Sequence, residues 1–178
     1  ERFGICAAIL RENDSIACVG TKAVSIEADT RVVTWPQGAT KYSLSSAYPA
    51  ILRRNFLAHS SLTLRTRAIA VVGNYDERLD SQFDHDLLIR LVQRGFAVVE
   101  YPSPLVARRF HASQSFEAKK RIKYLLHGAK VIRKGLWQDG KMFQALVLPI
   151  VFFLYGLLPR KLRLRAKGSA RSSRSETS

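Results

Sequence analysis

The sequence "QFDHDLLIRLVQRG" (residues 82–95) decides the fold class, because it predicts an amphipathic helix that packs on a sheet. Leu87, Leu88 and Leu91 recur at a helical period and fall on one face, with polar residues opposite. Gly95 stands where a left-handed residue commonly ends a helix. The stretch therefore predicts one short helix with a buried leucine face.

Two acids stand in the predicted first turn of this helix. Asp84 and Asp86 are one residue apart, and carboxylates are favoured at the positive end of the helix dipole. Aspartate is also a common N-cap, since its side chain accepts hydrogen bonds from the exposed amides of the first turn. Taken alone, both acids are explained by helix initiation, and a chemical role needs support from elsewhere in the chain.

The neighbouring segments predict alternating strands and helices. Short apolar runs predict strands at "SIACVGT" (15–21), "AVVEY" (97–101) and "LVARRF" (105–110), and "SAYPAILRRN" (46–55) predicts a helix. Helices that alternate with strands in one compact region are typical of an α/β fold. We therefore expect α/β architecture upstream of residue 117.

Charge divides the chain near Glu117. The whole sequence holds 29 Lys/Arg and 14 Asp/Glu, for a net charge of +15, and residues 118–178 alone hold 15 basic and two acidic residues. We expect three parts: a domain over residues 1–117, helices that associate with a membrane over 118–158, and a basic disordered tail over 159–178. The two cysteines lack ligand spacing, so they indicate neither a disulfide scaffold nor a zinc site.

The second part combines a basic amphipathic segment with an uncharged one. Ile122, Leu125 and Leu126 open an expected apolar face in residues 118–137, and basic residues occupy the other face. Residues 142–158 carry no charge, but a helix of that length spans only about 25 Å, and a bilayer core is about 30 Å thick. Three interpretations stay open: a monotopic or re-entrant membrane contact, which we favour, a single span, or a buried hairpin that caps the domain.

Three motifs follow one another in a family order. They are "GNYDE" (73–77), "FDHDLLIRLVQRG" (83–95) and "PSPLVARRFHASQS" (102–115). Together they resemble the C-terminal half of the catalytic domain of family 2 glycosyltransferases, which are inverting enzymes with the Rossmann-like GT-A fold. The resemblance covers about residues 1–117 and implies the C-terminal half of a GT-A domain followed by a helical tail.

The resemblance implies roles for four residues. Asp84 aligns with the family's general base, a carboxylate that takes a proton from the acceptor hydroxyl, although Phe83 replaces the glutamate that usually precedes it. Arg109 is expected at the nucleotide diphosphate, and Asp86 is expected either there or as a support for the helix start. His111 resembles a metal ligand in some relatives, with a surface strand as the alternative.

The family also implies a divalent cation, Mn or Mg, held mainly by an Asp-x-Asp motif in a nucleotide-binding first half. No Asp-x-Asp pair precedes Asp76 in this sequence. We therefore expect that the N-terminal nucleotide-binding half is missing, and that these 178 residues alone do not transfer sugar.

The function expected from the resemblance is transfer of a sugar, with inversion, from a nucleotide-sugar donor to a glycan or lipid-linked acceptor. The basic tail favours a peripheral or monotopic position at an anionic membrane surface, on the cytoplasmic face of the cell membrane. The alternative is a non-catalytic membrane-attached or partner-binding module, which is a degenerate transferase. Nucleic-acid binding is not expected, because a long uncharged apolar run would have no use there.

Overall fold

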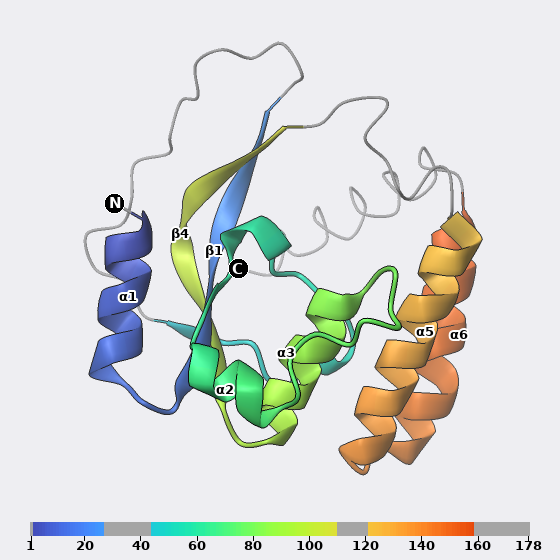
Figure 1. Cartoon of the computed structure of the whole chain (residues 1–178). Coiled ribbons are helices and arrows are strands. Elements are labelled where there is room, and N and C mark those ends of the chain that lie inside the picture. The colour runs from blue at the N-terminus through green and yellow to red at the C-terminus, as the bar shows by residue number, and fades with distance from the viewer. Residues whose placement is uncertain (1, 27–43, 110–120, 159–178) are drawn as a thin grey trace, which may run out of the picture.

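The computed structural model describes residues 2–26, 44–109 and 121–158. His111 and the tail over residues 159–178 lie outside the described residues, so their predicted roles stay predictions. The described chain is a mixed α/β protein, with a four-stranded sheet and helices around it (Figure 1). The predicted α/β class is thereby confirmed.

The sheet is built around two long parallel strands. Strand β1 (Ile16–Ile26) pairs in parallel with β4 (Ala97–Arg109) along nearly its whole length. Two short strands flank this pair, β2 (Ser45–Ser46) antiparallel to β4 and β3 (Thr63–Leu64) antiparallel to β1, which gives the order β2-β4-β1-β3. The central pair is parallel because helical segments connect its strands, as in βαβ units.

The prediction of two separate strands near the end of this region is wrong. Strand β4 continues from residue 97 to 109 without interruption. Thr21 pairs with Tyr101, but the next residue, Lys22, pairs with Pro104, so β4 bulges at Pro102 and Ser103. A bulge accommodates prolines that lack an N–H for the ladder.

The predicted helix over residues 46–55 is also wrong. Its first residue belongs to β2, and only a 3₁₀ turn, η1 (Ala50–Leu52), follows. The amide of Ala47 donates to the carbonyl of Val98 on β4, at 2.8 Å. This segment is therefore held by the sheet, and its helical pattern is overridden by strand pairing.

Helices cover both faces of the sheet. Helix α1 (Arg2–Glu12) packs on one face through Cys6, whereas α3 (Phe83–Gln93) packs on the other through Leu87, Leu88 and Leu91. A further 3₁₀ turn, η2 (His59–Ser61), and the short helix α2 (Thr66–Val71) complete the domain.

Both ends of α3 and the turn after α2 use left-handed residues. The leucine face of α3 is fully buried, as predicted. Gly95 has φ +87°, so the predicted glycine stop of α3 is confirmed, and Gly73 has φ +83° in the turn after α2. Gln82, which precedes α3, also takes a left-handed φ of 64°.

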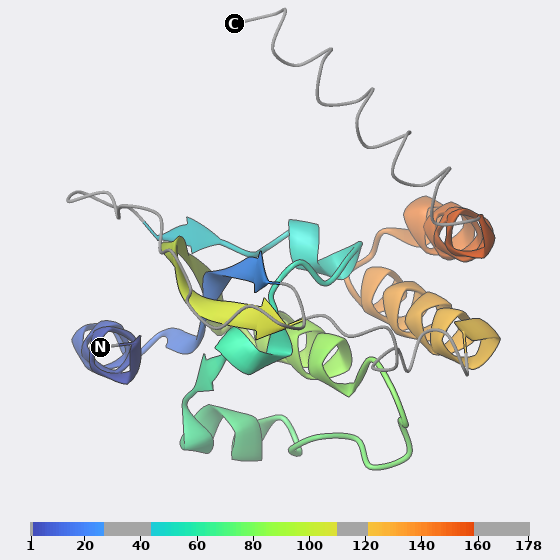
Figure 2. The ribbon, with the colours of Figure 1, turned by 90° about the horizontal axis from the view of Figure 1, so that it is seen from above.

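The C-terminal part forms a helical hairpin on the domain. Helix α5 (Arg121–Gln138) lies between α3 and α6 (Met142–Leu157), which returns beside it (Figures 1 and 2). Ile132 and Leu136 of α5 share one hydrophobic cluster with Ile89 of α3 and Leu52 of η1. Although the composition changes near residue 117, the described part of the hairpin shares a hydrophobic core with the domain and does not form a separate one.

Glycines bring these helices close together. A Cβ at Gly135 would lie 2.9 Å from a methyl carbon of Ile89, and one at Gly156 would lie 2.2 Å from a methyl carbon of Leu125. The buried face of α5 thus includes small residues, and this corrects the expected apolar face: Ile122 and Leu126 are 61% and 46% exposed.

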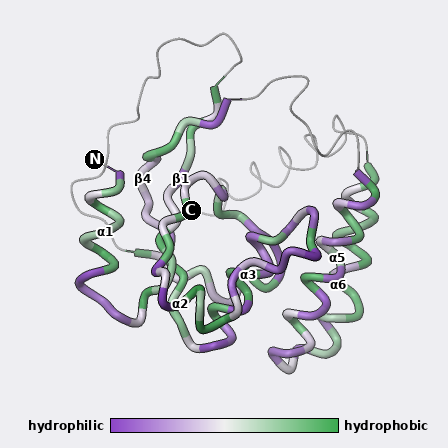
Figure 3. The backbone as a smooth tube through the Cα atoms, in the orientation of Figure 1, coloured by the Kyte–Doolittle hydropathy of each residue, from purple (hydrophilic) through white to green (hydrophobic). Residues whose placement is uncertain are grey.

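Helix α6 contacts α5 only through a narrow row of mostly small residues. Ala145, Pro149 and Gly156 are buried, while most of its large apolar side chains are exposed. Figure 3 shows the hydrophobic character of α6 along its length. The hairpin caps the domain through α5, but the interpretation of a fully buried hairpin does not fit α6. No helix within the described ranges is long and apolar enough to cross a membrane.

Candidate active site at the start of α3

Asp84 is the second residue of α3 and not its cap. The helix begins at Phe83, and Gln82 occupies the cap position without a side-chain hydrogen bond. The N-cap interpretation of Asp84 is therefore wrong, although the acid still lies in the first turn, where the helix dipole stabilises it. In Figure 1 the start of α3 lies beside the sheet, short of the ends of β1 and β4.

Each carboxylate oxygen of Asp84 accepts one hydrogen bond. Oδ1 accepts from the backbone N–H of His85 at 2.8 Å, and Oδ2 accepts from the side-chain amide of Asn55 at 2.8 Å. A carboxylate has about four acceptor positions, so two of these bonds leave room for a further donor. The half-buried carboxylate is therefore fixed in direction and still able to accept a proton.

Asn55 is itself positioned by the central strand. Its side-chain oxygen accepts from the amide of Leu57 at 3.2 Å, which turns its NH₂ group toward Asp84. Leu57 is buried and packs against Gly20 of β1, where a Cβ would lie only 2.8 Å from a Leu57 methyl carbon. A glycine in the sheet thus allows the close approach that places Asn55 beside the acid.

Three aromatic rings pack beside the start of the helix. His59, Tyr75 and Phe83 form mutual edge-to-face contacts, with ring centroids 5.5 to 6.1 Å apart, and the His59 Nε2 lies 3.4 Å from the Tyr75 hydroxyl. Burial, and then the charge of Asp84, raise the pKa of Tyr75. The Tyr75 hydroxyl is therefore protonated at neutral pH and remains a hydrogen-bond donor.

Asp86 points to a different neighbourhood from Asp84. It is 4% exposed, and its carboxylate accepts from Arg90 at 2.7 Å and from Lys134 of α5 at 3.4 Å. Arg90 also donates to the carbonyls of Val72 and Asn74, so this pair ties the turn after α2 to α3. This geometry supports the start of the helix and the loop after α2, which is one of the two roles that we expected for Asp86. The other expectation, diphosphate binding by Asp86, stays a prediction.

His85 separates the two acids and is buried. Its Nε2–H donates to the carbonyl of Ile51 in η1, at 2.6 Å. Burial lowers the pKa of His85, against the smaller opposing effects of this carbonyl and of the charges of Asp84 and Asp86. The imidazole is therefore neutral in the fold, and it anchors the start of α3 to η1, in line with the structural role expected of it.

Arg109 lies far from the start of α3, at the carboxyl end of β4. It ends β4, is exposed, and pairs in register with Ile26 of β1. In Figure 1 this end of β4 lies well away from the start of α3. The described residues therefore do not bring Arg109 next to Asp84. No group of three potential metal ligands occurs within the described ranges.

Sequence reasoning missed three neighbours of Asp84. Asn55 ends the segment predicted to be a helix, and His59 begins the 3₁₀ turn η2. Neither residue belongs to a quoted motif, and only the tertiary fold brings them to α3. Tyr75 had a signal, because it lies within the quoted "GNYDE" turn. Phe83, noted only as a departure from the family pattern, forms part of the ring cluster beside the acid.

Comparison with known proteins finds neither a protein-family model nor a curated protein that matches the chain.

Proposed function

We propose that the protein is part of an inverting glycosyltransferase of the GT-A type, with Asp84 as its general base. The observation that carries the proposal is the carboxylate of Asp84, held by Asn55 and by the amide of His85 at the start of α3. A base fixed by two donors is aimed at one point in space, and a proton acceptor within hydrogen-bond reach of a substrate hydroxyl suits general-base catalysis.

The proposed reaction has a simple balance. Asp84 accepts the proton of the acceptor hydroxyl while the hydroxyl oxygen forms a bond to the anomeric carbon of the nucleotide sugar. The bond from that carbon to the diphosphate oxygen breaks, and the nucleotide diphosphate leaves with the bonding electrons. Attack from the side opposite the leaving group inverts the anomeric configuration.

The remaining parts of the site follow from the sequence motifs. Arg109 is proposed to bind the diphosphate, with Asp86 supporting the start of α3. A divalent cation, Mn or Mg, would neutralise the charge that develops on the leaving diphosphate. His111 is proposed as one of its ligands. The acceptor is proposed to be a glycan or a lipid-linked glycan at the cytoplasmic face of the membrane.

The ring cluster suggests a role for Phe83, which replaces the glutamate that usually precedes the general base in the family. In place of a second carboxylate, a phenyl ring packs against His59 and Tyr75 at the start of α3. The Tyr75 hydroxyl is a neutral donor for the sugar, because its pKa is raised.

The test is sugar transfer by the complete gene product, assayed against a panel of nucleotide sugars and acceptors. Asp84→Asn keeps the size of the side chain and one of its two accepted hydrogen bonds but removes the base, so turnover should fall by at least about 100-fold. Asp80→Asn is the matched control, since Asp80 is a half-exposed acid paired with Lys123, and it should keep wild-type turnover.

Two results would contradict the proposal. Turnover retained by Asp84→Asn would remove Asp84 from the chemistry. Absence of transfer with every donor and acceptor would favour the alternative, a non-catalytic membrane-attached or partner-binding module derived from a transferase.

A further inference from the structure

The outer face of α6 carries a continuous apolar stripe. Phe143 is 79% exposed, Ile150 is 60% exposed and Leu154 is 58% exposed. Residues three or four positions apart share one helical face, so these side chains form one surface. We call it the α6 stripe, and it consists of Phe143, Leu146, Val147, Ile150, Val151 and Leu154. Soluble monomers rarely leave such a contiguous apolar surface uncovered.

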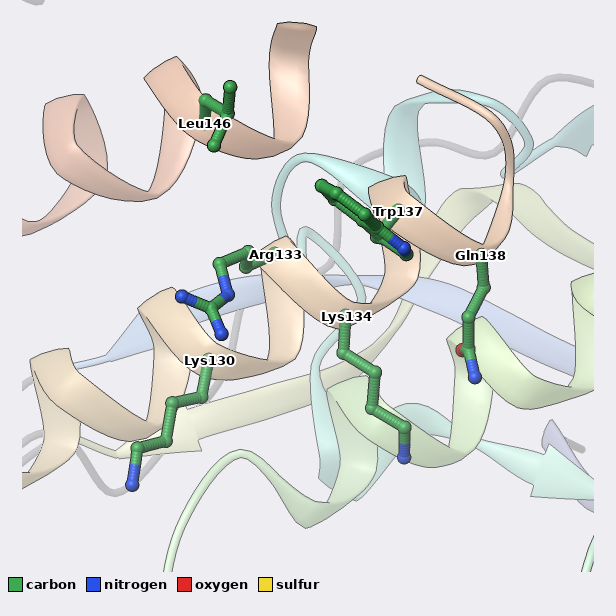
Figure 4. A pocket seen from close by; sticks show the side chains of 6 residues that line it. All are labelled: Lys130, Arg133, Lys134, Trp137, Gln138 and Leu146. Carbon is green, nitrogen blue, oxygen red and sulfur yellow. The ribbon is translucent and has the colours of Figure 1, made fainter. Parts of the chain in front are cut away.

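Helix α5 extends this surface and adds charge to its edge. Trp137 is half exposed, and it lines a groove of 670 Å³ with Leu146 of α6 and with Lys130 and Arg133 of α5. In Figure 4 the side chains of Trp137 and Arg133 project from α5 on the side of Leu146. The apolar stripe is therefore bordered by an indole ring and by basic side chains.

The charged residues of the hairpin are almost all basic. Residues 121–158 contain six Lys/Arg and a single acid, Asp139. That acid pairs with Lys141 and accepts a hydrogen bond from Tyr48, so it is already engaged. Helix α6 itself carries no charged residue. An uncharged face with a cationic border complements a surface that is apolar inside and anionic at its rim.

We propose that this surface binds an anionic phospholipid bilayer, with α6 lying in the plane of the interface. The α6 stripe enters the boundary between headgroups and acyl chains, at a depth of about 5–10 Å for helices of this kind. Arg133, which projects on the side of Leu146, reaches the phosphates (Figure 4). Lys130 projects from the opposite side of α5 and adds positive charge, and Trp137 lies at the headgroup level, where indole rings are enriched. This assignment rests on the hairpin alone and does not depend on sugar transfer.

A second copy of the chain fits the same surface less well. Most homodimers have two-fold symmetry, in which the same patch faces itself. The cationic border of one hairpin would then lie against the cationic border of the other, and like charges repel. An anionic bilayer instead neutralises Lys130 and Arg133, so the charge pattern favours lipid.

The first experiment measures flotation of the 178-residue chain with two kinds of vesicle. One is phosphatidylcholine alone, and the other contains about 30% phosphatidylglycerol, which makes about one lipid in three anionic. The variant Leu146→Gln/Ile150→Gln/Leu154→Gln removes the stripe and should lower binding to both vesicle types more than tenfold. Because these side chains are exposed, the fold should be kept, which circular dichroism checks. The matched control, Phe3→Gln/Val71→Gln, changes exposed apolar residues elsewhere and should bind as the wild type does.

The second experiment tests the charged border. Lys130→Gln/Arg133→Gln should weaken binding to the anionic vesicles by about 30-fold and leave binding to neutral vesicles unchanged, because each basic residue near the surface contributes about a factor of five. Arg11→Gln/Lys22→Gln makes the same charge change at exposed positions of α1 and β1, and it should leave both affinities unchanged.

Several results would overturn the proposal. They are a wild-type chain that floats with neither vesicle type, a stripe variant that floats as well as the wild type, and border and control pairs that weaken binding equally. Analytical ultracentrifugation covers the remaining case. If the wild type is a dimer without vesicle binding and the stripe variant is a monomer, a second copy covers the surface and the bilayer does not.

Discussion

Acidification should destabilise the fold through His85, the buried imidazole at the start of α3. Its Nε2–H donates to the carbonyl of Ile51, and burial lowers its pKa from the usual value of 6.5. Below that value the unfolded chain binds a proton at this position while the folded chain does not. The unfolded state therefore binds more protons, and the free energy of unfolding falls as the pH falls.

The size of this effect follows from proton linkage. Protonation of the unfolded chain at this position lowers the free energy of unfolding by up to about 1.2 kcal/mol between pH 7.0 and pH 5.5, a limit that is reached when the folded imidazole binds no proton. Other groups add their own dependence on pH, so the contribution of His85 is isolated by comparison with a variant. His85→Gln keeps a donor for the Ile51 carbonyl and cannot titrate in this range.

The measurement is urea unfolding of the wild type and of His85→Gln at both pH values. The variant should lose less stability than the wild type on acidification, by up to about 1.2 kcal/mol, whatever its stability at pH 7.0. An equal loss in the two proteins would refute the reasoning, because it would mean that the folded imidazole accepts a proton as readily as the unfolded one.

Three further changes test the packing around the site and the hairpin. Arg90→Met leaves the buried carboxylate of Asp86 without its main partner and should lower the free energy of unfolding by about 3 kcal/mol; a loss below about 0.5 kcal/mol in urea unfolding would contradict that pairing. Gly156→Ala places a methyl group against Leu125, and its cost should shrink by about 1–3 kcal/mol in the Leu125→Ala background, whereas additive effects would contradict close packing. Gly4→Ala, in α1 with nothing within 4 Å of the new Cβ, should raise stability by about 0.5–1 kcal/mol in the same assay, and a decrease would contradict the open space there.

Local pattern was sufficient for the elements whose own residues determine them. The leucines of α3 and the glycine stop at Gly95 encode burial and a left-handed turn in neighbouring positions, and the structure has them as predicted. The segment 46–55 has a helical pattern too, but its start pairs with β4. A partner that is distant in sequence cannot be seen in a local window.

The faces of α5 show the same limit. Apolar residue type predicted one face through Ile122, Leu125 and Leu126, but the helix turns Gly128 and Gly135 inward, toward α6 and α3, and leaves Ile122 and Leu126 exposed. Small residues allow helix axes to approach closely. Hydrophobicity alone does not distinguish these two ways of packing a helix.

In the candidate site, too, some features follow from the local sequence and others only from tertiary contacts. The sequence by itself determined that acids stand at the start of α3, that the fold is α/β, and that the last third is basic with an uncharged apolar run, because these are properties of residue type and spacing. Only the tertiary structure decided that Asp84 meets Asn55 while Asp86 is buried against Arg90, since neighbouring positions on a helix face different parts of the fold. It also decided which face of α6 stays uncovered, because that depends on the close contacts at Gly128 and Gly156, which no local pattern encodes.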